Sequence, residues 1–357
     1  MGWLDVPERV LMQKLLASLA GGDAPDLVNL GPVDAMRLAQ SNALVSTDGL
    51  VAAADRKKYF PQFWNAISAG GKPYSIPWYI TIRLLLYNRR IFREAGLDER
   101  TPPTSWEEIV AAARAIRKTG VYGLLPTVRL LDDWQLEGLP IVDASGRRAL
   151  FATPAHAAAV DFYTRLMRDD LIPRETLTGD YPEAVRRYKV GTLGMLVTGP
   201  QFLLSMRSEA PDVYADTGLG PLAKGKAGLV PASCMHFVIP RASKDHAGAS
   251  ALGLFLTDAE NQLAFCRLVP LLPSVTAAAK DPLFSGGRGE HPLEDEAMRI
   301  DAAQLPYARD LTLSLPSLSR LNLALNDAVE AAINGRAPAL AMLEKAAARW
   351  DEILAQP

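Results

Sequence analysis

Three observations predict a mixed α/β fold for this chain. Short apolar runs rich in β-branched residues alternate with amphipathic helical patterns along most of its 357 residues. Hydrophobic residues make up 49% of the chain, which is enough to fill packed cores. The length corresponds to about two domains. Because strands become sparse in the last third, we expect that helical part to pack on sheets formed earlier in the chain.

The N-terminal part predicts a helix, a strand and a longer extended segment. Residues 7–20 place leucines at helical spacing, and a Gly-Gly pair ends that helix. Residues 26–30 form a short apolar run, which predicts a buried strand. Residues 76–88 are strand-like and lead into a short helix at 89–95.

The clearest helix start in the chain follows a Pro-Pro pair. Ser105 can cap this helix, and Glu108 stands three residues later, as a capping box requires. We expect the helix to run to about Lys118. Thr153 and Pro154 begin another helix in the same manner, with proline at the first helical position.

The remaining pattern predicts short strands and long helices. We expect strands at 193–197 and 237–240, and helices that begin near Ser243 and Asp258 or span 318–334 and 339–354.

Composition excludes several classes of protein. The formal net charge of −2 argues against binding of nucleic acid or an anionic membrane through the charge of the whole chain. No apolar stretch is long enough to span a membrane. Cys234 and Cys266 both lie in apolar runs, so we expect buried thiols rather than a disulfide framework. The four histidines are scattered and predict no metal site.

Two motifs that suggest enzymatic chemistry are incomplete. Residues 220–226 match the Gly-x4-Gly-Lys spacing of a phosphate-binding loop, but Ala227 stands where Ser or Thr must reach Mg²⁺. Asp132 and Asp133 offer carboxylates for glycoside chemistry, yet adjacent residues on one element point apart. A glycosidase that uses Asp133 is therefore the least favoured function.

A series of moderately specific motifs runs through the chain in a fixed order. Residues 21–28 lead from a helix end into a strand, and residues 71–97 contain Pro-Tyr-Ser-Ile-Pro-Trp-Tyr and then Arg-Glu-Ala-Gly-Leu. The later motifs lie at 102–108, 194–200, 218–225, 257–262 and 271–274. With these residues the sequence resembles the extracellular solute-binding proteins of family 1, the maltose-binding-protein type of sugar ABC transporters. The resemblance covers essentially the whole chain.

The resemblance implies a type II periplasmic-binding-protein fold, in which two interleaved α/β lobes are joined by crossover hinge strands. The crossovers correspond to residues 76–85 and to a segment near 233–238. An N-terminal lobe is then expected from residues 1–80 and 234–285, and a C-terminal lobe from residues 81–233 and 286–357.

The same resemblance implies a non-enzymatic, substrate-binding component of an ABC importer. It is expected to bind a sugar or oligosaccharide between its lobes by hinge closure, with a maltodextrin as the favoured ligand, and to deliver it to the membrane permease subunits. A receptor for glycerol-3-phosphate or a polyol is the alternative on this fold, although phosphate would require more basic residues than Arg83 alone. No cofactor is expected.

The N-terminus differs from the family pattern. Relatives begin with a further strand and helix behind a signal peptide, often with a lipid-anchored cysteine. We therefore expect this chain to be N-terminally truncated and its full-length form to be extracytoplasmic, either periplasmic or membrane-anchored. A strand edge bared by the truncation would favour oligomerisation or domain swapping.

A sugar site needs aromatic rings for the C–H face of the sugar and polar groups for its hydroxyls, because an unpaired buried polar group costs about 1–3 kcal/mol. Trp78, Tyr79, Thr81 and Arg83 supply both kinds. Strand alternation places the last three on one face and Trp78 on the other, where core packing and stacking are both open. Arg83 is predicted to contact ligand, with a structural ion pair as the alternative.

Further ligand contacts are predicted in both lobes. Asp34 follows the strand at 26–30, at the edge where α/β sheets bind ligands, with helix capping as its alternative role. Asp133 and Trp134 are predicted to line the second lobe.

Two more candidates lie where this chain departs from its relatives. Gln201 and Phe202 replace a stacking tryptophan after Gly-Pro, so either Phe202 takes the stacking role or the second lobe lacks that platform. His236, in the second crossover, is a further predicted cleft residue.

Overall fold

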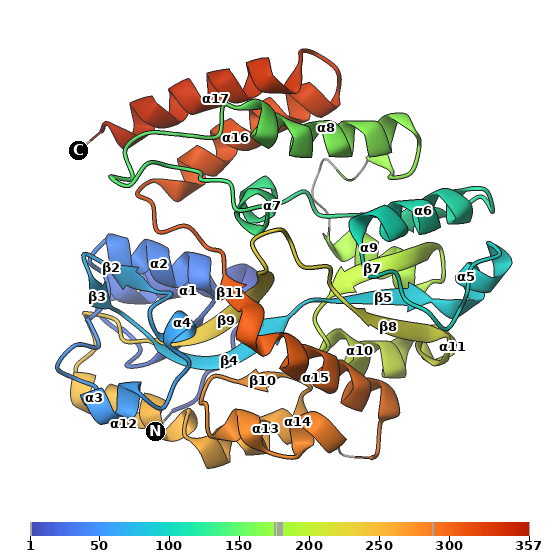
Figure 1. The fold of residues 1–357 in the computed structure, drawn as a ribbon. Coiled ribbons are helices and arrows are strands. Elements are labelled where there is room, and N and C mark those ends of the chain that lie inside the picture. Colours follow the sequence, from blue (N-terminus) through green and yellow to red (C-terminus); the bar gives the residue numbers. More distant parts are fainter. Residues whose placement is uncertain (1, 175, 177–180, 288, 357) are drawn as a thin grey trace. The chain divides into compact units, whose positions relative to one another are not determined.

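The computed structural model describes residues 2–174, 176, 181–287 and 289–356 (Figure 1). The chain divides into two compact units. Unit 1 comprises Met1–Ile80 and Ser233–Pro282, and unit 2 comprises Thr81–Ala232 and Leu283–Pro357. Each unit is therefore assembled from two separated segments. Strands β4 (Ile76–Ile82) and β9 (Val230–Val238) each begin in one unit and end in the other.

Unit 1 is built on a sheet with the strand order β1-β9-β4-β10. β1 (Val28–Leu30) is antiparallel to β9, and β10 (Leu272–Pro273) is antiparallel to β4. Successive residues of β9 face opposite sides of the sheet, and each side has its own core. Val238 packs with α1 (Glu8–Gly21) and α2 (Pro32–Gln40), whereas Phe237 packs with residues of α12 (His246–Leu256) and α13 (Ala259–Leu268).

The remaining elements of unit 1 are short. They are α3 (Ala53–Arg56), α4 (Pro61–Trp64), β2 (Ser68–Ala69), β3 (Lys72–Pro73) and the 3₁₀ turn η2 (Ala278–Lys280).

Unit 2 contains a four-stranded sheet with the order β6-β7-β5-β8. β6 (Tyr122–Leu124) runs parallel to β7 (Leu193–Thr198), and β5 (Leu84–Asn88) is antiparallel to both β7 and β8 (Thr217–Pro221). The β5–β8 pairing brings the ring of Tyr87 across Gly218. A Cβ at Gly218 would lie 2.2 Å from Cζ of Tyr87, so only glycine fits there.

Helices cover both faces of this sheet. Leu84 and Leu86 pack with α9 (Tyr181–Lys189), α10 (Phe202–Glu209) and α15 (Pro292–Gln304). Leu85 and Tyr87 face a larger core that includes Trp350. This core is enclosed by α5 (Arg89–Glu94), α6 (Trp106–Arg117), α7 (Leu130–Leu136), α8 (Pro154–Arg168), α16 (Leu318–Ile333) and α17 (Ala339–Leu354).

The C-terminal helices α16 and α17 form a hairpin that packs against α8, as the red and green ribbons of Figure 1 show. Unit 2 is completed by α11 (Pro211–Ala215), α14 (Leu283–Gly286), η3 (Leu305–Tyr307) and β11 (Ala308–Asp310), which runs parallel to the start of β9.

The local signals in the sequence are confirmed. Ser105 and Glu108 form the predicted capping box of α6, and Thr153 accepts a hydrogen bond from the backbone N–H of His156 at the start of α8. Cys234 and Cys266 are buried thiols. The single extended segment predicted at 76–88 is instead two strands, β4 and β5, interrupted at Arg83. None of the helices that the structure describes is long and apolar enough to cross a membrane.

Candidate functional site

Several strand ends converge at one edge of the unit 2 sheet. β6, β7 and β8 finish there at Leu124, Thr198 and Pro221. β5 begins at the same edge, because Leu84 pairs with both Thr198 and Pro221. The carboxyl ends of parallel strands are where α/β sheets bind ligands. Arg83 immediately precedes Leu84 and is therefore at this edge.

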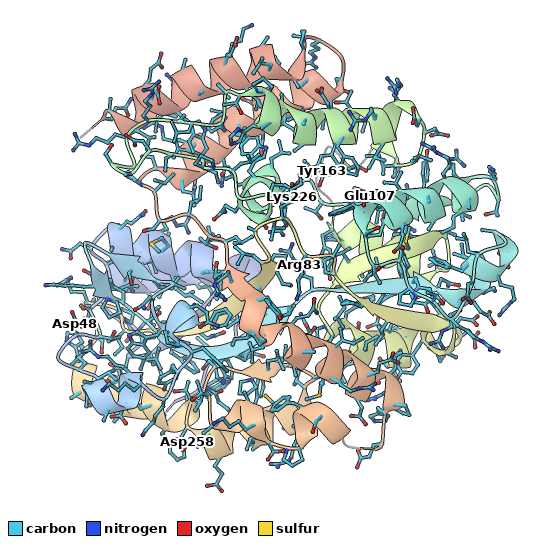
Figure 2. All side chains as sticks on the ribbon, viewed as in Figure 1. Asp48, Arg83, Glu107, Tyr163, Lys226 and Asp258 are labelled. Atoms are coloured by element: carbon cyan, nitrogen blue, oxygen red, sulfur yellow. The ribbon has the colours of Figure 1, made fainter. Side chains whose placement is uncertain are left out.

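Arg83, which is labelled in Figure 2, is partly buried. It makes no hydrogen bond or direct ion pair with any residue that the structure describes. Burial lowers its pKa most strongly, because it disfavours the charged guanidinium, and repulsion by Arg129 lowers the pKa further. Asp132, Tyr181 and Asp133 act in the opposite direction. Arg83 thus lies close enough to two carboxyls to be influenced by them, without the structural ion pair that was its alternative role.

The two carboxyls come from the first turn of α7, the helix in the connection after β6. Leu130 and Trp134, four residues apart, are buried on its inner side. Burial raises the pKa of Asp132, while Arg83 and Arg129 lower it.

Asp133 has a specific neighbour on α8. The hydroxyl of Tyr163, labelled in Figure 2, donates a hydrogen bond of 2.9 Å to Oδ2 of Asp133. Burial raises the pKa of Asp133 to about 7, and the hydrogen bond from Tyr163 is the largest opposing influence. Asp133 therefore changes its charge near neutral pH.

The loop after β7 brings two predicted residues together. A Cβ at Gly199 would lie 2.5 Å from Cγ2 of Thr81 and 2.3 Å from Oε1 of Gln201, so both side chains border this glycine. The hydroxyl of the preceding Thr198 is hydrogen-bonded to that of Tyr181. Tyr181 is 39% exposed and presents an aromatic side chain at the edge that Arg83 occupies.

Trp134 and Phe202, both predicted to line the site, are core residues. Trp134 is 0% exposed, stacks on Phe151 with ring centroids 5.3 Å apart, and donates a hydrogen bond of 3.1 Å from Nε1 to the carbonyl of His156. Phe202 is 8% exposed and packs with Leu203 in the core beneath α10. Both helices turn these rings inward, so the predictions of ligand contact fail for them. Phe202 provides no stacking platform.

His236 in unit 1 is also enclosed, contrary to the prediction. Its side chain is 0% exposed, and Nδ1 is 2.9 Å from the hydroxyl of Ser75. Burial lowers the pKa of His236 to about 3, so the imidazole is neutral. It is a structural residue of the crossover strand β9.

The other unit 1 candidates lie at or near its surface. Trp78 stacks on Phe237 and Phe265, with centroids 4.7 and 5.0 Å apart, so core packing accounts for much of its ring. Tyr79 is partly buried beside Trp78. Asp34 lies in the first turn of α2 and forms an ion pair of 2.9 Å with Arg37.

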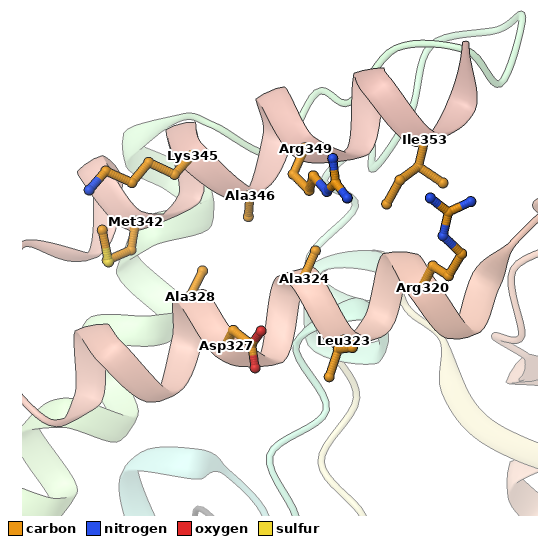
Figure 3. Close-up of a pocket in the computed structure, with 10 residues that line it drawn as sticks. All are labelled: Arg320, Leu323, Ala324, Asp327, Ala328, Met342, Lys345, Ala346, Arg349 and Ile353. Carbon is orange, nitrogen blue, oxygen red and sulfur yellow. The ribbon is translucent and has the colours of Figure 1, made fainter. Parts of the chain in front are cut away.

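A groove of about 490 Å³ between α16 and α17 is a second candidate site (Figure 3). Ala324, Ala328 and Ala346 leave it open, and Arg320 and Ile353 lie together at one end. No aromatic side chain lines it, so it lacks a surface for the apolar face of a sugar. In the part of the chain that the structure describes, no three His, Cys, Asp or Glu side chains gather as a metal site.

Sequence reasoning missed Arg129, Tyr163 and Tyr181. Arg129 is in the same connection as Asp133, and that proximity was the one available signal. The other two reach the site only through the packing of α8 and α9, which no local pattern indicates.

A guanidinium and two carboxyl groups that no ion pair joins lie near one another at this sheet edge, and they suit a ligand that both donates and accepts hydrogen bonds. Known proteins agree with a solute-binding role. The chain matches the family described as bacterial extracellular solute-binding protein over residues 3–263. It is 33% identical to a structure from Synechococcus sp. MITs9220 that carries the name of an oligosaccharide periplasmic-binding protein, with a TM-score of 0.87 over 99% of this chain and 91% of that one.

Two curated relatives have lower sequence identity, and their alignments still cover most of this chain. A binding protein of Brucella abortus (strain 2308) is 24% identical over 98% of this chain and 84% of its own length. The sn-glycerol-3-phosphate-binding periplasmic protein UgpB of Agrobacterium fabrum is 23% identical over 80% of this chain and 68% of its own.

The family match spans most of the chain, and the interleaved α/β units correspond to the type II periplasmic-binding-protein fold. The chain belongs to the bacterial extracellular solute-binding proteins, and it is the substrate-binding component of an ABC importer.

Proposed function

We propose that this protein binds a neutral oligosaccharide of the maltodextrin type, and that the edge of the unit 2 sheet supplies the main polar contacts. Arg83, Asp132 and Asp133 carry the proposal. Arg83 influences the pKa of both carboxyls and both influence the pKa of Arg83, yet no ion pair joins them. A sugar hydroxyl accepts from a guanidinium and donates to a carboxylate, so vicinal hydroxyls can bridge these groups.

The roles of the side chains follow from their chemistry. Arg83 donates to sugar oxygens, and Asp132 and Asp133 accept from hydroxyls. Tyr181 offers a ring to the C–H face of a sugar. Thr81 and Gln201, which border Gly199, add smaller donors and acceptors. In unit 1 we keep Asp34, Trp78 and Tyr79 as further contacts, and hinge closure as the accompanying motion that the family resemblance implies.

We further propose that the protein is not an enzyme and acts outside the cytoplasm, as a periplasmic or lipid-anchored receptor for the permease subunits. Its relatives carry the names of binding proteins. Incubation with maltotriose should release no reducing ends. Release at a rate proportional to protein concentration, and lost in Asp133→Asn, would establish a glycosidase instead.

Titration calorimetry with maltose, maltotriose and trehalose tests the binding proposal. We expect a dissociation constant of about 1 μM, or roughly −8 kcal/mol, for at least one of them. Arg83→Ala should weaken that binding strongly. Absence of heat and of thermal stabilisation with all three sugars would reject a maltodextrin-type ligand.

Glycerol-3-phosphate is a second candidate, which Arg83 and Arg129 favour because both are cationic and neither has an ion-pair partner among the described residues. The UgpB relative points the same way. The nearby carboxyls of Asp132 and Asp133 oppose it, since they would repel a phosphate. Glycerol-3-phosphate therefore belongs in the same titration, where binding that weakens steeply with salt would favour the anion.

A further inference from the structure

Helix α15 carries an unusual buried polar face. Glu294, Asp301 and Gln304 are 0%, 1% and 4% exposed. Glu294 is well partnered, because Arg207 Nη1 lies 2.5 Å from its Oε1 and the hydroxyl of Tyr214 donates to its other oxygen. Asp301 and Gln304, by contrast, have no such partners among the described residues.

Neither Asp301 nor Gln304 satisfies its side-chain polar atoms. Both carboxyl oxygens of Asp301 and both amide atoms of Gln304 are buried without a hydrogen-bond partner among the described residues. Three residues apart on a helix, the two side chains share one face. Native proteins leave few buried groups in this state, because each costs about 1–3 kcal/mol.

The backbone beside Asp301 belongs to the candidate site. Burial raises the pKa of Asp301 well above its ordinary range, and the N–H of Ile82 is near enough to act in the opposite direction. No charged group contributes, and burial without an ion-pair partner favours the protonated, neutral form of this carboxyl. Ile82 is the last residue of β4, Arg83 follows it, and α15 packs against β5 and β8.

We propose that Asp301 and Gln304 are positioning residues that hold the Ile82–Arg83 backbone so that Arg83 presents its guanidinium to the ligand. A protonated carboxyl can accept from the N–H of Ile82 with its carbonyl oxygen while its O–H donates to the amide oxygen of Gln304. The inference rests on the proposed function only through the role of Arg83 in binding.

Amide hydrogen exchange and calorimetry on the full chain test this role together. Asp301→Asn keeps a neutral group of the same shape and should leave both measurements near wild type. Asp301→Leu removes the polar atoms. It should speed exchange at Ile82 at least fivefold relative to the rest of unit 2 and weaken oligosaccharide binding about fivefold, which corresponds to one hydrogen bond. Its melting temperature should fall, because the N–H of Ile82 and the amide of Gln304 each lose a hydrogen-bond partner.

Glu294→Gln is the matched control on the same helix. It removes a charge that Arg207 and Tyr214 stabilise, so it should lower stability without selective exchange at Ile82. Should Asp301→Leu not fold, Gln304→Met, which retains volume, should show the same selective changes.

Wild-type exchange at Ile82 in Asp301→Leu or Gln304→Met would overturn the proposal, as would faster exchange spread evenly through unit 2. If the wild-type protein binds none of the sugars, the proposed function fails, and the exchange measurement alone still decides whether these residues fix the junction.

Discussion

Asp133 accepts a hydrogen bond of 2.9 Å from the hydroxyl of Tyr163, which ties the first turn of α7 to the middle of α8. Tyr163 is 4% exposed, so this contact lies on the core side of the carboxyl. Tyr163 therefore fixes the position of one carboxylate oxygen of Asp133, and Arg83 still lowers the pKa of this carboxyl.

The raised pKa of Asp133 predicts a particular pH dependence of stability. Its carboxyl has a pKa of about 7 in the folded protein and an ordinary value of 3.8. The folded state therefore binds more protons between these values, and its contribution to stability should fall as the pH rises from 3.8 to about 7. Asp133→Asn should remove this component, as urea unfolding at several pH values would measure. Parallel curves for the two proteins would contradict it.

Tyr163→Phe should move this pH-dependent fall in stability to higher pH. The hydroxyl stabilises the ionised carboxylate, so its loss should raise the pKa of Asp133 above 7. Comparing the unfolding free energies of Tyr163→Phe with those of the double variant Tyr163→Phe/Asp133→Asn isolates the shift. A transition at the same or lower pH would show that the hydrogen bond does not govern the carboxyl.

Arg83→Ala should weaken oligosaccharide binding about 10- to 100-fold, because hydrogen bonds to charged groups contribute about 1.5–3 kcal/mol. Stability should not fall, since a partly buried guanidinium without an ion pair is removed. Calorimetry and thermal melting measure the two effects. Arg100→Ala, on an exposed position, is the control and should change neither. Equal affinity for Arg83→Ala and wild type would remove Arg83 from the site.

Trp134→Ala should lower the free energy of unfolding by about 3–5 kcal/mol, as expected when a large aromatic leaves a core. At temperatures where the variant is folded, affinity should change far less than in Arg83→Ala. Denaturant titration followed by calorimetry would separate these effects. Lost affinity with retained stability would restore the ligand contact that the sequence suggested for this ring.

Gly199→Ala should weaken binding by displacing Thr81 and Gln201, whose atoms lie 2.5 and 2.3 Å from the new Cβ. Thr81→Ser removes Cγ2 and keeps the hydroxyl. It should restore part of the affinity in the double variant, because Gln201 is flexible enough to move aside. Calorimetry on the two single variants and the double variant gives the coupling. Purely additive losses would mean that Thr81 does not border Gly199 as described.

The parts of the fold that sequence predicted best depend on neighbouring residues. The capping box of Ser105 and Glu108 spans four residues, so it can be recognised in the sequence without tertiary information. Helix α17 was likewise predicted over 339–354, because its apolar stripe continues through the whole element. The interruption between β4 and β5 was not predicted, since Arg83 is a single residue within an apolar run.

The site was predictable only in part. Arg83 was predicted as a site residue because a charge within an apolar strand is costly unless it has a partner. Trp134 was misassigned because α7, Leu130–Leu136, has too few turns for its buried side to be read from periodicity. Tyr163 and Tyr181 meet Asp133 and Thr198 across 30 and 17 residues, and only the packed helices bring them there.

The division of unit 2 into two distant segments has a consequence for synthesis. Its large core includes Trp350 and Leu354, which are synthesised long after Ala232. At about 5–20 residues per second, the segment from Thr81 to Ala232 is complete several seconds before α16 and α17 exist to cover it. The core of unit 2 therefore stays incomplete until α16 and α17 have been synthesised, and chaperones can bind the apolar residues that these helices later cover.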